Sequence, residues 1–164
     1  MKNYHKQVID QIISSLGLFD QVCYTEKLAV LHGSTIGQHF RHIIEFYECL
    51  INATENGVVN YENRKRNLLI EQDPQYALQV MQVLVNKIAT LELSMGLALE
   101  FTEDETPYFV NSTFDRELMY LSEHTIHHFA LIKIATTNCF QHIQIEKNFG
   151  VAPSTIAYQK QMNA

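Results

Sequence analysis

Histidines gather in two short stretches of this 164-residue chain. The first stretch holds His39 and His42, and the second holds His124, His127 and His128. Residues four apart lie on one face of a helix, so a helix through the second stretch presents His124 and His128 side by side. Neutral imidazole is the commonest metal ligand among side chains. If the two stretches form packed helices, three imidazoles can converge on one divalent ion and leave coordination positions open, as catalytic metal sites do.

The helical period places the second histidine pair among apolar residues. His124 and His128 share a face with Leu121, Leu131 and Ala135. An imidazole that faces a core is costly unless each ring nitrogen finds a partner, and a metal ion supplies one. The alternative is that both histidines are structural and bond to hydroxyl or backbone groups. The presence of a second histidine group favours metal binding.

Periodicity alone does not choose the ligand from the first stretch. His39 lies closer than His42 to the centre of the apolar stripe of its helix, which favours His39. Phe46, one turn after His42, indicates that a neighbouring helix can pack on that flank and turn His42 inward. His127 lies at the edge of its own apolar face, and we interpret it as a supporting or rim residue.

Spacing excludes several other kinds of site. The segment from His124 to His128 lacks the glutamate of a zincin motif, and the chain has no Glu-x-x-His of the ferritin-like di-iron type. Ser122 has no nucleophile-elbow glycines around it, so we expect no Ser-His-Asp arrangement. All-nitrogen ligation suits zinc, nickel, iron or copper and does not distinguish among them.

Four helices must position these residues. The 3.6-residue period predicts an all-α, four-helix bundle with helices over 4–16, 34–54, 73–93 and 112–137. Ser34 is the expected cap of the second helix, Asp73-Pro74 opens the third, and Ser112 begins a capping box for the fourth. Before the last helix, 98–102 and 108–110 can pair as a short β-hairpin.

Composition indicates one helical domain covering residues 1–164. The chain is 46 % hydrophobic and 18 % charged, with six glycines and three prolines. The net charge of −6 argues against a nucleic-acid partner, and no run of about 18 apolar residues predicts a membrane span. Three scattered cysteines form neither a CxxC pair nor a disulfide framework. We therefore expect a cytoplasmic protein in which Cys49 is an inert thiol.

The two histidine stretches, in this order, resemble the DinB/YfiT-like superfamily of metalloproteins. The resemblance rests on Gly37-Gln-His-Phe-Arg-His-Ile-Ile-Glu45 and on the pair His124 and His128. It implies a four-helix bundle that holds a divalent ion (zinc, nickel or iron) with three histidines. It also selects His42, the later histidine of its stretch, as the third ligand. The arrangement is similar to the DinB-like domain of ergothioneine sulfoxide synthases, whose additional catalytic domain this sequence does not show.

The resemblance implies a metal-dependent enzyme. Because the superfamily includes proteins similar to thiol-dependent S-transferases and maleylpyruvate isomerase, the favoured function is an S-transferase that uses a low-molecular-weight thiol. Tyr120, one turn before His124, is a candidate for orienting a substrate or moving a proton. The alternative is a non-catalytic metal- or ligand-binding bundle that acts as an interaction module. Related proteins are often homodimers, and we expect one here from apolar residues outside the stripes, namely Phe109, Phe114, Met119 and Phe129.

A polar segment after the second helix adds three candidate residues. Tyr61, Arg64 and Arg66 resemble a motif found at this place in part of the superfamily. The two arginines can bind a substrate carboxylate through paired hydrogen bonds. The alternative is that they pair with carboxylates such as Glu62 or Glu71 and fix the loop.

Overall fold

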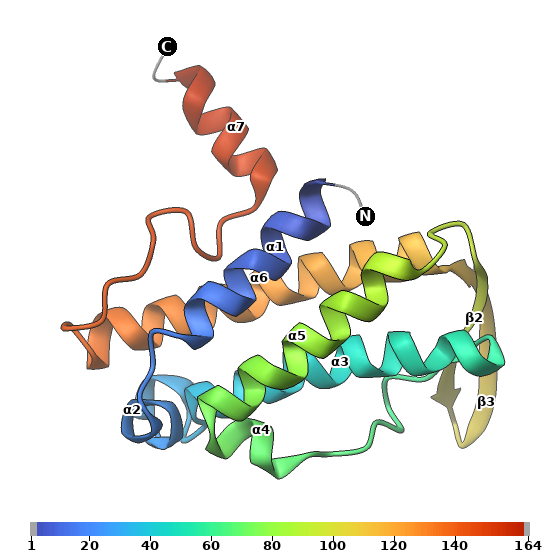
Figure 1. Ribbon diagram of the computed structural model, residues 1–164, viewed down its shortest axis with the longest axis horizontal. Helices are drawn as coiled ribbons and strands as arrows, with labels where there is room; N and C mark the ends of the chain where they lie inside the picture. The colour runs from blue at the N-terminus through green and yellow to red at the C-terminus, as the bar shows by residue number, and fades with distance from the viewer. Residues whose placement is uncertain (1–2, 163–164) are drawn as a thin grey trace.

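The computed structural model describes residues 3–162, which are mostly helical with one small sheet. In chain order the elements are α1 (Asn3–Leu16), α2 (Gln21–Thr25), the 3-10 turn η1 (Ala29–Leu31), α3 (Ile36–Asn56), β1 (Val58–Val59), α4 (Leu68–Gln72), α5 (Pro74–Thr90), β2 (Gly96–Glu103), β3 (Thr106–Thr113), α6 (Phe114–Cys139) and α7 (Pro153–Met162) (Figure 1). No helix within 3–162 is long and apolar enough to cross a membrane.

The four long helices α1, α3, α5 and α6 pack in a cycle. Helices α1 and α3 each contact both α5 and α6, and α3 runs beside α6 along the length of the molecule (Figure 1). Their apolar stripes form one core, whose largest fully buried side chains include Tyr24, Phe40, Tyr47, Phe114 and Phe129. Each such side chain contributes on the order of 1.5–3 kcal/mol through burial. Because the core is this large, we expect the helices to fold without a bound ion.

The four predicted principal helices are present, but the N-caps of α3 and α6 each lie one residue after the predicted one. Thr35, not Ser34, caps α3, because its hydroxyl accepts from the Gln38 N–H while the Gln38 side chain returns to the Thr35 backbone. At α6 the cap is Thr113, not Ser112, because the Thr113 hydroxyl accepts a hydrogen bond from the Arg116 N–H. Asp73 caps α5 as expected.

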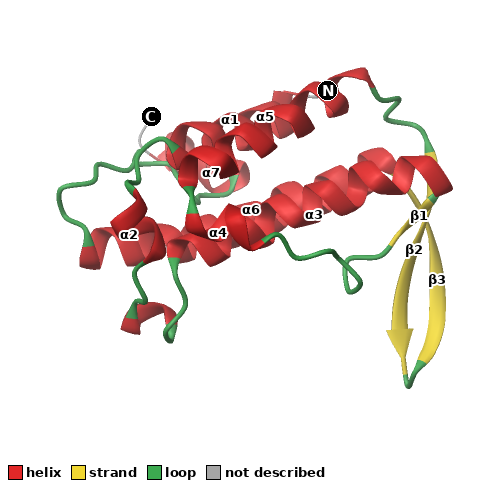
Figure 2. Cartoon of the chain, turned by 60° about the horizontal axis from the view of Figure 1, so that its bottom comes forward, coloured by secondary structure: helices red, strands yellow, loops and turns green. Residues whose placement is uncertain are grey.

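The prediction of an all-α fold needs a correction, although the hairpin is confirmed. Strands β2 and β3 pair antiparallel, with Glu100 opposite Phe109, over longer segments than the sequence indicated. The two-residue strand β1 then pairs parallel with β2, which makes a three-stranded sheet in the order β1-β2-β3. A strand of two residues is too short to leave an alternation pattern, so the sequence could not reveal it. Figure 2 shows the hairpin projecting beyond the helices.

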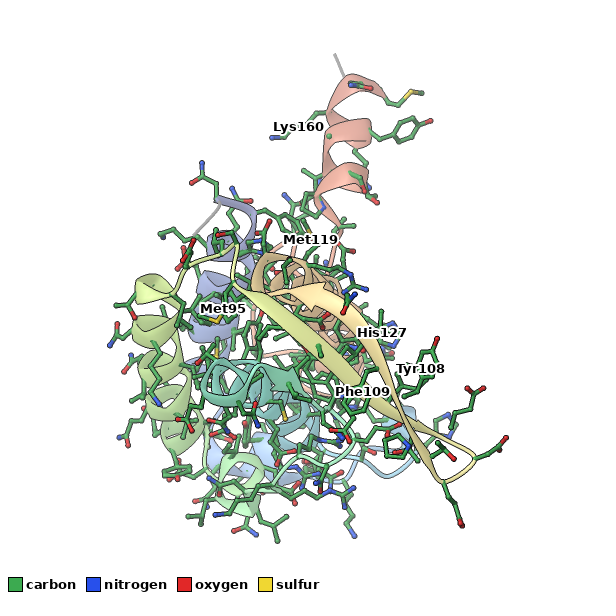
Figure 3. All side chains as sticks on the ribbon, turned by 90° about the vertical axis from the view of Figure 1, so that its right-hand side faces the viewer. Met95, Tyr108, Phe109, Met119, His127 and Lys160 are labelled. Carbon is green, nitrogen blue, oxygen red and sulfur yellow. The ribbon has the colours of Figure 1, made fainter. Side chains whose placement is uncertain are left out.

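Of the four apolar residues expected at a dimer interface, only some are on the surface. Phe114 and Phe129 are fully buried in the core, so these two residues do not support the expected homodimer. Phe109 and Met119 are exposed. Figure 3 shows Phe109 on the hairpin and Lys160 on α7, a helix that stands apart from the others and has no buried residue.

We predict that Gly37→Ala destabilises the protein, because α3 passes close to Glu71 and Tyr24 at this residue. A Cβ at Gly37 would collide with the Glu71 carbonyl and come within 2.8 Å of the Tyr24 ring. The expected loss is about 1–3 kcal/mol of unfolding free energy, measured by urea denaturation. The control is Gly96→Ala, where an added Cβ meets open space and the change should stay within about 0.5 kcal/mol. Equal effects at both glycines would contradict the close packing at α3.

Candidate metal centre

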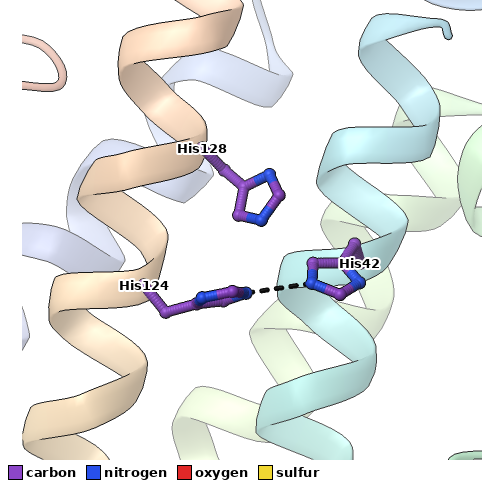
Figure 4. Close-up of side chains that lie close together, drawn as sticks. All are labelled: His42, His124 and His128. Carbon is purple, nitrogen blue, oxygen red and sulfur yellow. Dashed lines mark hydrogen bonds between the residues drawn. The ribbon is translucent and has the colours of Figure 1, made fainter.

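Three half-buried histidines from two helices converge between α3 and α6. His42 on α3 faces His124 and His128 on α6 (Figure 4). One nitrogen from each ring lies within 4.8 Å of the other two, and the Nε2 atoms of His42 and His124 are 2.9 Å apart. The ring centroid of His42 lies 5.0 Å from that of His124 and 4.7 Å from that of His128.

Packing explains why His42 reaches the cluster from the flank of its stripe. Helix α6 lies against that flank of α3, and the Phe46 ring, one turn beyond His42, stacks on His124 with centroids 4.7 Å apart. On α6 the pair His124 and His128 is one turn apart and points the same way, as the i, i+4 spacing predicts.

The other two histidines of the stretches lie beside the cluster. His39 Nδ1 is 2.9 Å from His128 Nδ1, so these two rings share a hydrogen bond. If His128 ligates through its Nε2 atom, His39 is placed to fix the orientation of that ring, as partners of metal ligands generally do. His127 is exposed and meets His128 edge-on at 5.6 Å between centroids.

A buried carboxylate holds Arg64 beside the cluster. The side chain of Glu45 is fully buried, and its oxygens lie 3.2 Å from Arg64 Nε and 3.4 Å from Arg41 Nε. Arg64 also donates to the Tyr61 carbonyl oxygen, and its Nη2 lies 3.4 Å from His42 Nδ1. Arg64 therefore has a fixed place between Glu45 and the histidine cluster, with a carboxylate of this chain as its ion-pair partner.

The remaining candidate residues, Tyr61, Tyr120 and Arg66, do not all lie near the histidine cluster. Tyr120 stacks on His124 at 5.7 Å and so contacts the cluster directly, whereas Tyr61 stacks on Phe46 at 4.8 Å and reaches the cluster only through that ring. Arg66 is exposed and lines a different surface hollow together with Glu48. The sequence predicted that Arg64 and Arg66 act together, but Arg64 lies against Glu45 and His42 whereas Arg66 lies in a different hollow.

Burial keeps the histidines neutral at pH 7. Desolvation, reinforced by neighbouring charged groups, lowers the pKa of His42 to about 4 and that of His128 to about 3. Desolvation also lowers the pKa of His124 and of His39. The neutral form is the one that binds metal.

The donor set fits a divalent ion. Nitrogens bound to tetrahedral zinc at 2.0–2.1 Å stand about 3.3 Å apart, so the 2.9 Å contact between His42 and His124 needs only a small opening. Residues His42, His124 and His128 would hold the ion, and His39 and Arg64 would border it.

The structure also contains a serine–histidine contact that the sequence did not reveal. His5 Nδ1 lies 2.9 Å from Ser122 Oγ, and His5 Nε2 lies 3.7 Å from an Asp115 oxygen. His5 and Ser122 are both fully buried, and the Ser122 hydroxyl donates to the Leu118 carbonyl. A nucleophile needs access to a substrate, so this contact is structural. No local pattern could have revealed it, because α1 and α6 lie far apart in the chain.

Comparison with known proteins identifies one partial relative and no family. The chain is 34 % identical over 110 residues to "FK506-binding protein 5" from Rhizopus delemar. The matched segment covers 63 % of this chain and 28 % of that protein, so the chain spans less than a third of the relative's length. No family model matches the sequence, and no solved structure matches it.

We predict that the metal-free protein loses stability as the pH falls from about 6.5 toward 4. The folded pKa values of the cluster histidines lie below the usual 6.5, so in this range the unfolded chain binds more protons than the folded one. Chemical denaturation at pH 7.5, 6 and 5 measures the slope. A variant with His42, His124 and His128 all replaced by glutamine should show a shallower slope. Identical slopes would mean that the cluster is not buried and neutral.

Proposed function

We propose that this protein is a DinB/YfiT-like metalloprotein in which His42, His124 and His128 hold one divalent ion, which is zinc, nickel or iron. The observation that carries the proposal is the convergence of three neutral, half-buried imidazoles from α3 and α6. The packing of four long helices in one cycle supports the same assignment.

We further propose that the activity is transfer of a small thiol to an electrophile. When bound, the ion would lower the pKa of a thiol or water at an open coordination position and so supply a nucleophile at neutral pH. Three neutral ligands suit this role, because they leave the full double charge of the ion to act on the bound group. The thiol sulfur would bond to the electrophilic carbon, the leaving group would depart with its electron pair, and the thiol proton would pass to solvent.

The surrounding side chains have distinct roles in this proposal. The Arg64 guanidinium is paired with Glu45 and lies next to His42, where its Nη2 group can donate a hydrogen bond to an anionic group at the ion. Phe46 and Tyr61 form a stacked wall that keeps water from one side of the cluster. Burial raises the pKa of Tyr120, so its hydroxyl stays protonated and can donate a hydrogen bond to a substrate.

The alternative proposal is a non-catalytic bundle that binds a metal or small ligand as an interaction module. It is favoured by the surroundings of the cluster, where the Glu45 carboxylate beside Arg64 is engaged by two arginines rather than available as a base. The partial relative is named for binding FK506, but the match covers 28 % of that protein. Most of that protein lies outside the match, so we do not propose FK506 binding for this chain.

We predict that the apo protein binds one divalent ion and that His42→Ala, His124→Ala and His128→Ala each abolish stoichiometric binding. Equilibrium dialysis followed by metal analysis measures this, with circular dichroism to confirm folding. His39→Ala should retain the site with an affinity about 10–100-fold weaker, because it removes only an orienting contact. His142→Ala, at an exposed residue away from the cluster, is the control. Stoichiometric metal in the His124→Ala protein would refute the ligand assignment.

We predict metal-dependent thiol transfer. Metal-loaded protein would be assayed with 1-chloro-2,4-dinitrobenzene and a panel of glutathione, bacillithiol, coenzyme A and cysteine. At least one thiol should give turnover and chloride release above the rate with apo protein or with the His42→Ala variant. Thiol binding to the loaded protein without turnover would instead favour the interaction module.

A further inference from the structure

Strand β3 forms an exposed edge of the sheet. The strands lie in the order β1-β2-β3, and no other strand within residues 3–162 pairs with the outer side of β3. Every residue of β3 except Ser112 is exposed, and the hairpin projects beyond the helices (Figure 2). An exposed edge strand offers its outward N–H and C=O groups to another strand.

The turn of the hairpin fixes which backbone groups face outward. Asp104 and Glu105 have positive φ values of 46° and 62°, as in a two-residue type I′ turn, where the residues that flank the turn exchange both hydrogen bonds. From that pair onward, every second residue of β3 bonds to β2. Phe109 and Asn111 lie between the bonded residues and therefore direct their N–H and C=O groups away from β2.

Two contacts of β2 support this alternation. Ala98, which lies opposite Asn111, donates its N–H to the Gly57 carbonyl at 2.8 Å, on the side of β1. Thr102, four residues along the same strand, donates its N–H to the Glu62 carboxylate at 2.9 Å. Both N–H groups therefore point away from β3, and the residues opposite them on β3 face the free edge.

The edge has little protection against pairing. Charged side chains and prolines normally block exposed edges, but β3 contains no charged residue and exposes Tyr108, Phe109 and Val110. Pro107 removes one outward N–H, yet it lies toward the tip of the hairpin and leaves the groups of Phe109 and Asn111 available. The hairpin also has little support of its own, because β1 pairs with β2 over two residues only and a two-stranded hairpin is marginally stable.

We propose that β3 pairs antiparallel with β3 of a second copy of this chain, so that the two hairpins form one continuous sheet. The edge is complementary to itself about a twofold axis that passes through Val110. In this register Phe109 lies opposite Asn111 of the second copy, and about four backbone hydrogen bonds form across the axis. The two Val110 side chains meet at the axis on the same face of the sheet, and the pairing covers part of the exposed apolar surface of the strand.

Neighbouring registers are less favourable. Moving the axis toward the tip would bring Pro107 opposite Phe109 or Asn111 and lose a hydrogen-bond donor. Moving it the other way would bring Thr113 into the central pairing, and Thr113 is the N-cap at which α6 leaves the sheet. The axis at Val110 avoids both problems. The inference goes beyond the proposed function, because the paired edge contains none of the three histidines.

The test measures the mass of the full chain by sedimentation velocity at about 5 and 100 μM. Wild-type protein should approach twice the 19.0 kDa of one chain at the higher concentration. Val110→Lys and Val110→Glu should each be monomeric, because like charges meet at the axis, and an equimolar mixture of the two should form dimers again. Asn111→Pro should weaken association at least about tenfold by removing an outward N–H. Val83→Lys, an exposed change on α5, should leave the dimer intact.

Circular dichroism and urea denaturation would confirm that each variant is folded. Wild-type protein that stays monomeric, or that forms assemblies larger than two chains, would overturn the inference. So would a dimer that persists in the Val110→Lys and Asn111→Pro variants, since it would form through another surface. A mixture of the two Val110 variants that stays monomeric would overturn the register. Association should be equal in apo protein and in the His124→Ala variant, so failure of the metal assignment leaves this inference standing.

Discussion

The contact between α3 and α6 is the interaction on which the rest of the structure depends. This contact buries Phe40 of α3 against Phe129 of α6, and the centroids of the two rings lie 6.5 Å apart. Rigid helices carry this packing along their length, so it also sets the separation of His42 from His124 and His128. A loop could not hold three imidazoles at such spacing without additional support, whereas two packed helices hold them with residues whose main role is in the core.

Placing imidazoles in this interface has an energetic cost. Burial lowers the pKa of His42 and His128, which means that the fold excludes their charged forms. Each ring then needs partners for both nitrogens, and the contacts of His42 with Arg64 and of His128 with His39 meet part of that need. Glu45 has a related role. Its buried carboxylate pairs with the Arg64 guanidinium, which would otherwise lie beside the cluster without a counter-charge. An ion bound between the three rings would satisfy the nitrogens that face inward.

Phe46, Tyr61 and Tyr120 form an aromatic layer beside the histidine cluster. On one side of this layer lie the neutral histidines and Arg64, and on the other lies a hollow lined by α6, β2 and the segment after β1. Aromatic rings suit this boundary, because they exclude water without introducing a charge and their faces tolerate cations on either side. The hairpin completes the arrangement, since β2 contributes one wall of the hollow and β1 ties the end of α3 to β2.

The sequence by itself determined the features that depend on neighbouring residues. The period of the apolar residues revealed the long helices, Asp73 and Pro74 marked the start of α5, and the i, i+4 spacing put His124 and His128 on one face. Only the tertiary structure decided the features that depend on contacts between distant segments. It chose His42 over His39 for the cluster, directed Arg64 and Arg66 apart, and paired β1 with β2. It also turned Phe114 and Phe129 into the core. The physical reason is that backbone geometry repeats every few residues and leaves its period in the sequence, whereas the rotation of one helix against another is set by the packing of side chains that lie far apart in the chain.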